Sequence, residues 1–112
     1  TFCTKLSSLN LKGCRQITDV AVCSIAKSGK ELQLLVLSEC VAITDASIVV
    51  LAQSCALLQD LDLEDVCISD TSILALAGGC KLLRSLNIMN GGGDITEEAL
   101  RVLPDTCSIF GP

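Results

Sequence analysis

The sequence contains no histidine, no tyrosine and no tryptophan, and its 112 residues include only two phenylalanines. Without histidine, neither a Ser–His–Asp triad nor an imidazole base or metal ligand can be formed. The net charge of −5 offers no basic footprint for nucleic acid, and no apolar run approaches the ~18 residues of a membrane span. These absences indicate a non-enzymatic domain inside the cell, in the cytoplasm or nucleus, that binds neither nucleic acid nor membrane and uses no cofactor or metal.

A short leucine pattern recurs four times along the chain. The segment Leu-x-x-Leu-x-Leu begins at Leu6, Leu32 and Leu58, and a version ending in isoleucine begins at Leu83, so successive starts are 26, 26 and 25 residues apart. Such self-similarity at a fixed period is typical of repeat architectures. We predict a single domain over residues 1–112, part of a longer array because solenoids need polar caps at their ends. The predicted repeats span residues 3–29, 30–55, 56–80 and 81–107, with the start of a fifth at 108–112.

The second half of each repeat has the pattern of a helix. It opens with an isoleucine, a hydroxyl residue and an acid, first as Ile17-Thr18-Asp19. The hydroxyl can accept a hydrogen bond from a backbone N–H of the first turn, and the helix dipole stabilises the carboxylate. Apolar residues follow at helical spacing. We therefore predict an α/β leucine-rich-repeat solenoid, or horseshoe, with a parallel β-sheet on the concave face and α-helices on the convex face.

The full pattern resembles a known subclass of this repeat. The spacing Leu-x-x-Leu-x-Leu-x-x-Cys-x-x-Ile-Thr-Asp is carried by residues 6–19 with Cys14 and by residues 32–45 with Cys40. It is similar to the cysteine-containing repeat of F-box substrate receptors and of mitotic-exit-network antagonists. The resemblance implies a protein-interaction module, the substrate-recruiting region of an SCF-type ubiquitin ligase receptor. The alternative is a structural scaffold of a cytoskeletal or ciliary assembly with no link to ubiquitin.

Two of the repeats depart from the pattern. The third is one residue short before Ile68, and its cysteine is displaced to Cys67. The fourth has a glycine-rich stretch at residues 90–94 in place of the cysteine, which we interpret as a loop because it lacks the lysine and hydroxyl of a phosphate-binding motif. Pro104 also falls within the predicted fourth helix, which should therefore end or kink near Leu103.

The eight cysteines admit three interpretations. Zinc sites use paired C-x-x-C spacings, which are absent here, and disulfide-rich secreted domains use cysteines to close loops in a poor core. These cysteines recur instead at equivalent repeat positions, and free cysteine behaves as a small buried hydrophobe. We favour reduced structural thiols over a regulatory disulfide or a metal site, and regard Cys23, on a helix flank, as the exception. The thiols predicted to be buried are Cys3, Cys14, Cys40, Cys55, Cys80 and Cys107.

Acidic residues are concentrated in the middle of the chain. Residues 31–80 contain eight acids and no base, whereas residues 1–30 contain five bases and one acid. Alternation along a strand places Asp60, Asp62 and Glu64 on the concave face, about 6.7 Å apart. Their spacing also resembles the opening of a calcium loop, but the glycine and the final glutamate of that loop are missing. The row is either a solvated face that keeps the solenoid soluble or a binding surface for a basic partner.

Apolar and polar residues flank this acidic row on the neighbouring strands. The second strand should present Leu34, Val36 and Ser38 on the concave face, and the fourth should present Ser85, Asn87 and Met89. An apolar anchor beside polar groups is typical of a recognition surface. We hypothesise that a basic protein or peptide binds there, and we also expect self-association through the open ends of the solenoid. The predicted binding residues are Leu34, Val36, Asp60, Asp62, Glu64, Asn87 and Met89.

Overall fold

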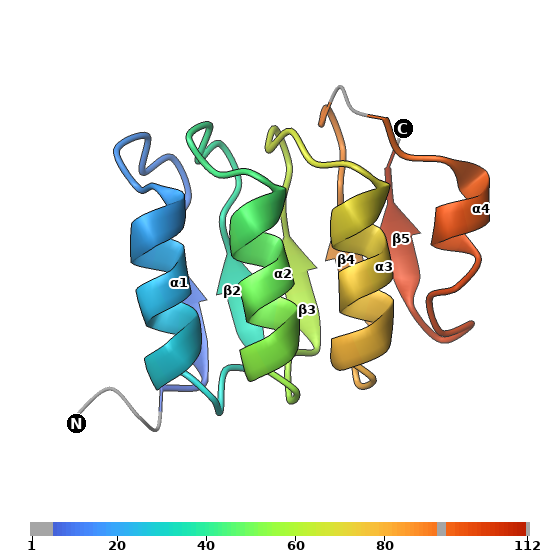
Figure 1. Ribbon diagram of the computed structural model, residues 1–112, viewed down its shortest axis with the longest axis horizontal. Helices are drawn as coiled ribbons and strands as arrows, with labels where there is room; N and C mark the ends of the chain where they lie inside the picture. The colour runs from blue at the N-terminus through green and yellow to red at the C-terminus, as the bar shows by residue number, and fades with distance from the viewer. Residues whose placement is uncertain (1–5, 92–93, 112) are drawn as a thin grey trace.

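The computed structural model describes residues 6–91 and 94–111. Strands and helices alternate along the chain, and the helices stand in a row in front of the strands (Figure 1). The elements are β1 (Ser8–Asn10), α1 (Asp19–Ser28), β2 (Leu34–Val36), α2 (Asp45–Ser54), β3 (Asp60–Asp62), α3 (Asp70–Gly79), β4 (Ser85–Asn87), α4 (Glu97–Leu100) and β5 (Ser108–Phe110).

All five strands belong to one parallel sheet in the order β1-β2-β3-β4-β5. The strands pair in register, so that equivalent residues of successive repeats lie side by side. All the helices cover the same face of the sheet (Figure 1), and the other face, the predicted concave face, is called the open face below. The predicted α/β leucine-rich-repeat solenoid is therefore confirmed.

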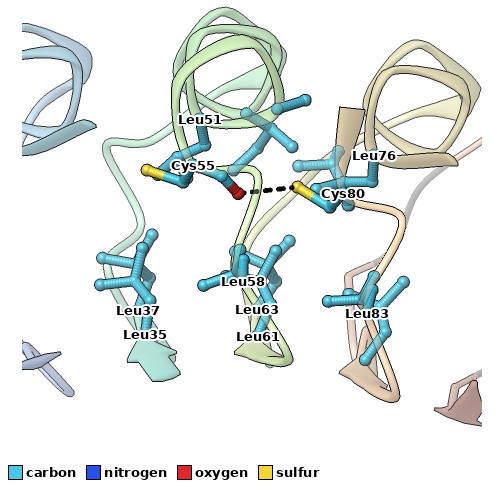
Figure 2. Packing of buried hydrophobic residues seen from close by; sticks show 14 of the residues in the cluster. Leu35, Leu37, Leu51, Cys55, Leu58, Leu61, Leu63, Leu76, Cys80 and Leu83 are labelled. Atoms are coloured by element: carbon cyan, nitrogen blue, oxygen red, sulfur yellow. Dashed lines mark hydrogen bonds between the residues drawn. The ribbon is translucent and has the colours of Figure 1, made fainter. Parts of the chain in front are cut away.

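Leucine and isoleucine fill the space between the sheet and the helices. The middle residue of each inner strand is buried, as Leu35, Leu61 and Leu86 show. From the helix side, Leu51 and Leu76 are fully buried against these strands (Figure 2). Burial of one such side chain contributes about 1.5–3 kcal/mol, and each layer packs on the next. A stack of equivalent layers thus stabilises a fold that no single repeat could form alone.

Cysteine thiols link each repeat to the preceding one. The Sγ atom of Cys80 donates a hydrogen bond to the carbonyl oxygen of Cys55 at 3.4 Å (Figure 2). Cys55 donates likewise to the carbonyl oxygen of Gly29 at 3.5 Å, and Cys40 to that of Leu11 at 3.1 Å. Cysteine at these positions therefore fills a narrow apolar space and also supplies a weak donor to a backbone carbonyl of the neighbouring repeat.

Most of the cysteine predictions hold. Burial is confirmed for Cys40, Cys55, Cys80 and Cys107. Cys14 is half-buried because a neighbouring repeat covers it on one side only among the described residues, and Cys3 lies outside those residues. Cys23 is half-buried on its helix flank. Burial raises the pKa of the Cys80 thiol to about 11, with a smaller contribution from Cys55.

Residues in the left-handed conformation follow the first four strands. They are Gly13, Glu39, Asp65 and Asn90, with φ between 57° and 75°. Glycine adopts this conformation freely and asparagine and aspartate tolerate it, whereas glutamate is poorly suited to it. The position of Asp65 in the acidic stretch thus has a backbone reason that is unrelated to binding.

The next loop position points into the core and explains both irregular loops. It holds Cys40 in the second repeat, Val66 in the third and Gly91 in the fourth, and all three are buried. Val66 has taken the inward place of the cysteine, so the displaced Cys67 is exposed. The fourth repeat keeps the left-handed turn residue at Asn90. Gly92 and Gly93 of its glycine-rich stretch lie outside the described residues.

Each acidic residue at a helix start binds the start of the next helix. Asp45 accepts hydrogen bonds from the backbone N–H of Ser69 at 2.9 Å, from its hydroxyl at 2.7 Å and from the hydroxyl of Ser72. The same arrangement joins Asp19 to Thr44 and Ser47, and Asp70 to Thr96. We call Asp19, Asp45 and Asp70 the carboxylate ladder. It runs from repeat to repeat along the row of helices.

The ladder lowers the pKa of two of its members. Burial alone would raise the pKa of Asp45, but the hydrogen bonds from Ser72 and Ser69 outweigh burial and hold the pKa below its usual value. The pKa of Asp19 is lowered against burial in the same way, by Ser47 and Thr44.

The predicted hydroxyl caps are present on three helices. Thr44, Ser69 and Thr96 accept a hydrogen bond from a backbone N–H of the first turn of α2, α3 and α4 respectively. Thr18 of α1 makes no such bond. The cap prediction therefore holds for α2, α3 and α4 and is wrong for α1.

The fourth helix is much shorter than predicted. It ends at Leu100, before the expected end near Leu103. The chain continues in a tighter turn, in which the N–H of Val102 bonds to the carbonyl of Ala99 at 3.2 Å and that of Leu103 to Leu100 at 3.2 Å. Pro104 disfavours helical geometry at the residue before it, and here its effect extends over the whole last turn.

Candidate interaction surface

The first and third residues of each strand lie on the open face, because side chains alternate along a strand. In the sheet register they form two rows that cross all five strands. The first row is Ser8, Leu34, Asp60, Ser85 and Ser108, and the second row is Asn10, Val36, Asp62, Asn87 and Phe110.

A depression of about 320 Å³ lies on the open face between β2 and β5. It is lined by Leu34, Leu35, Val36, Asp60, Leu61, Asp62, Ser85, Asn87 and Phe110. Five of the predicted binding residues are thus brought together around one hollow: Leu34, Val36, Asp60, Asp62 and Asn87. The structure gives them a common site, and their role in binding stays a prediction.

Two of the predicted binding residues, Glu64 and Met89, lie outside the lining of the depression, and Ser38 is not exposed on the open face. Met89 is nevertheless 43% exposed. Ser38 was expected beside Val36 and is instead buried, with 2% of its surface exposed. Each of these residues stands two positions beyond the end of a strand. The inference from alternation is wrong for Ser38, because alternation holds only while the chain remains extended.

Phe110 is a lining residue that the sequence analysis missed. It is 52% exposed and lies beside Asn87 in the second row. The sequence contained the signal, because Ile109 continues the register of the buried strand leucines and its neighbours must then face outward. Residues 108–112 were predicted only as the start of a fifth repeat and not as part of the open face.

The acidic row is partly neutralised by a base from the next strand. The Nη2 atom of Arg84 lies 3.5 Å from Oδ2 of Asp60, with both side chains open to solvent. Arg84 stands just beyond the base-free stretch of residues 31–80 in sequence. Among residues 6–91 and 94–111, Asp62 takes part in no ion pair. Glu64 is 3.4 Å from the amide nitrogen of Asn87.

Val36 occupies a position that holds a polar residue in the neighbouring repeats. Asn10, Asp62 and Asn87 each accept, at 3.0 Å, a hydrogen bond from the backbone N–H two residues further on. Valine cannot form this bond. The second repeat thus gives up a local hydrogen bond and, together with Leu34, gains an apolar surface in the depression.

Within residues 6–91 and 94–111, no three acidic or cysteine side chains are grouped closely enough to hold a metal ion. In the same residues, no helix has both the length and the apolar character that a membrane crossing requires.

Comparisons with known proteins agree with the repeat architecture. A family model described as leucine-rich repeat matches residues 2–26. The C-terminal domain of tropomodulin from Caenorhabditis elegans is similar in structure, with a TM-score of 0.62, 14% sequence identity, and coverage of 88% of this chain and 80% of that chain. The search of curated proteins gives no significant match. At this identity the likeness to the tropomodulin domain concerns the fold alone.

Proposed function

We propose that this chain is a protein-interaction module that binds a basic segment of a partner protein in the depression between β2 and β5. One observation carries the proposal. The depression combines the apolar surface of Leu34 and Val36 with the carboxylates of Asp60 and Asp62. A preformed surface of this kind costs little ordering on binding, and a few anchors then dominate the affinity.

The two carboxylates should contribute unequally. Asp60 already shares its charge with Arg84 at 3.5 Å. Asp62 is free of ion pairs among the described residues, although its Oδ1 atom accepts the N–H of Glu64 at 3.0 Å. A lysine or arginine of the partner should therefore pair mainly with Asp62.

The experiment is a charge reversal followed by a pull-down. Asp60→Lys combined with Asp62→Lys should abolish capture of partner proteins, because both side chains face the depression. The fold should survive, since neither side chain packs in the core, and circular dichroism checks this. Glu31→Lys combined with Asp105→Lys makes the same change in net charge at exposed positions outside the depression. Equal capture by the wild type and both double variants would place the binding surface elsewhere.

Two classes of protein remain candidates for the whole molecule. One is the F-box substrate receptor that the cysteine pattern resembles, and the other is a structural scaffold of a cytoskeletal or ciliary assembly. The structural likeness to the tropomodulin domain favours the scaffold hypothesis. The test is co-purification of the full-length protein with the ubiquitin-ligase adaptor that an F-box contacts. Recovery of the adaptor supports the receptor, and its absence at a matched expression level supports the scaffold.

The same proposal assigns the domain no catalysis and an intracellular location. The 112 residues include no histidine, which removes the commonest general base from them. Cysteines packed at repeat positions are suited to the reducing environment of the cytoplasm or nucleus.

Self-association is a second proposal that rests on a different surface. A groove of about 260 Å³ at the β1 end has a mainly apolar lining: Leu6, Leu9, Leu11, Ile25, Ser28, Gly29 and Leu32. Residues 6–30 contain four bases and one acid, whereas residues 94–111 contain four acids and one base. A second copy could therefore stack head to tail on this end, with apolar burial and opposite charges both favouring the contact.

Equivalent lysines provide a matched test of this stacking. Lys30 directly follows the C-cap residue of α1, and Lys81 directly follows the C-cap residue of α3. Both lysines are exposed. Lys30→Glu should weaken self-association several-fold in analytical ultracentrifugation, whereas Lys81→Glu, in the middle of the solenoid, should not. A strictly monomeric wild type at high concentration would contradict the proposal.

A further inference from the structure

The depression is longer across the strands than along them. Its lining reaches from β2 to β5, which is three strand spacings or roughly 14 Å at about 4.8 Å each. Along each strand only two residues face outward, which is roughly 7 Å. A bound segment of polypeptide should therefore cross the strands rather than run parallel to them.

An extended segment fits this length better than a helix. Side chains at i, i+2 and i+4 of an extended chain lie on one face and span roughly 13 Å. An α-helix is about 10–12 Å wide with its side chains, which is more than the width of the floor. The i and i+7 side chains of a helix are also separated by only about 10.5 Å along its axis.

The chemistry of the floor changes along this path. β2 offers Leu34 and Val36, β3 offers Asp60 and Asp62, and β5 offers the exposed ring of Phe110. β4, between β3 and β5, offers the polar Ser85 and Asn87, so the order across the strands is apolar, acidic, polar and apolar. At the two apolar positions of the second row, Val36 and Phe110 stand where other strands carry asparagine or aspartate.

Resting on the proposed function, we propose that the ligand is an extended segment with the pattern apolar-x-basic-x-apolar. One apolar side chain packs on Leu34 and Val36, the basic group at i+2 pairs with Asp62, and the apolar side chain at i+4 packs on Phe110. The two intervening side chains point away from the sheet and carry no selectivity. The pattern reads the same in both chain directions.

Synthetic peptides test the spacing directly. The spaced peptide is Ser-Ser-Leu-Thr-Lys-Thr-Phe-Ser-Ser, and the permuted peptide, Ser-Ser-Thr-Leu-Lys-Phe-Thr-Ser-Ser, has the same composition and charge. A third peptide replaces the lysine of the spaced peptide with glutamate. Binding is measured by NMR titration of the isotope-labelled protein. The spaced peptide should bind at least about tenfold more tightly than the permuted one, because only one of the two apolar anchors can be seated in the latter.

Two substitutions by asparagine remove the apolar contacts that Val36 and Phe110 would make with the peptide. Val36→Asn and Phe110→Asn each introduce the residue that β1 and β4 carry at this position, so the fold should tolerate them. Either change should reduce the preference for the spaced peptide to about twofold or less. Val41→Asn replaces an exposed apolar residue outside the depression and should leave the preference unchanged.

Arg84→Gln should tighten binding of the spaced peptide several-fold, because it frees Asp60 from its ion pair.

The outcomes separate this inference from the proposed function. If the spaced and permuted peptides bind equally and both exceed the glutamate peptide, the pattern is overturned and a basic-segment surface is retained. If no peptide binds at about 1 mM, the free energy of binding is weaker than about −4 kcal/mol for all three, and the inference is overturned. The pull-down with the charge-reversal variants, which uses no peptide, then decides the proposed function by itself.

Discussion

Among single residues, Glu39 has the side chain that is least suited to its backbone conformation. Its φ of 64° lies in the left-handed region, where side chains other than those of asparagine and aspartate are disfavoured. Glu39→Asn places there the residue that the fourth repeat already uses at Asn90. We expect the free energy of unfolding to rise by about 0.5–1 kcal/mol, measured by urea denaturation. Glu39→Gln removes the same charge without relieving the backbone, so an equal gain in that control would contradict the explanation.

The cysteines should differ widely in their reactivity with alkylating agents. Cys67 is exposed, whereas burial raises the pKa of Cys80 to about 11. The thiolate is the reactive species, so iodoacetamide at pH 8 should modify Cys67 first and Cys80 only after denaturation. Mass spectrometry of timed digests follows both sites. Modification of Cys80 at a rate close to that of Cys67 in the folded protein would contradict the buried position.

The raised pKa of Cys80 also has a consequence for stability. Above the ordinary thiol pKa of 9.0, the unfolded chain loses this proton while the folded chain keeps it up to about 11. The folded state thus binds more protons over this range, and stability falls with rising pH. The contribution of this thiol is fully present below pH 9 and is lost between pH 9 and about 11.

At the element scale, two adjacent glycines at the end of α3 should respond in opposite ways to the same change. A Cβ atom at Gly79 would lie 1.9 Å from the carbonyl oxygen of Ala52 in α2, whereas one at Gly78 would have no atom within 4 Å. Gly79→Ala should therefore destabilise the fold by about 1–3 kcal/mol through overpacking. Gly78→Ala should stabilise it by about 0.5–1 kcal/mol through backbone entropy. Thermal unfolding of both variants checks the two signs, and equal effects would contradict the close approach of the helices.

The carboxylate ladder should make the packing of the helices depend on pH. The folded-state pKa of Asp45 is below the ordinary value of 3.8, because hydrogen bonds from Ser72 and Ser69 outweigh burial. Its contribution to stability is therefore present above that value and is lost as the pH falls through the folded pKa. Asp45→Asn should lower the free energy of unfolding at pH 7 by about 1–3 kcal/mol, the scale of hydrogen bonds to a charged group.

Comparison at two pH values isolates this contribution. Urea denaturation of the wild type and of Asp45→Asn should differ at pH 7, and the difference should shrink as the pH falls below the ordinary value of 3.8 and the carboxyl group takes up a proton. Asp105→Asn, an exposed acid outside the ladder, serves as the control and should have little effect at either pH. A difference between the wild type and Asp45→Asn that stays constant with pH would show that the charge of Asp45 is unimportant.

At the scale of the whole molecule, charge is unevenly distributed along the solenoid. Bases dominate the first repeat, and acids dominate the stretch from residue 31 to residue 80. Binding of a basic segment on the open face should therefore weaken with rising salt, since exposed charges are screened within about 10 Å at 0.1 M. Titration of the spaced peptide at two salt concentrations measures this effect. An affinity that is independent of salt would mean that Asp62 contributes nothing to recognition.

Local patterns in the sequence predict the repeat, the alternation of strand and helix, and nearly all of the core. These features depend on local patterns, namely the leucines of each strand and the hydroxyl residue and acid at each helix start. Each of these patterns lies within one repeat, so it predicts the local structure without reference to the neighbouring repeats. Five of the predicted binding residues, including Leu34 and Asp62, also follow from alternation within the strands.

Contacts between residues of different repeats could not be predicted from these local patterns. Arg84 reaches Asp60 from the next strand, Asp45 binds Ser69 one repeat further on, and Phe110 closes one end of the depression. These partners are separated by 24 residues or more in sequence, except that Phe110 follows its neighbour Asn87 by 23. Their contact depends on the register and spacing with which the repeats stack, which no pattern within a single repeat contains.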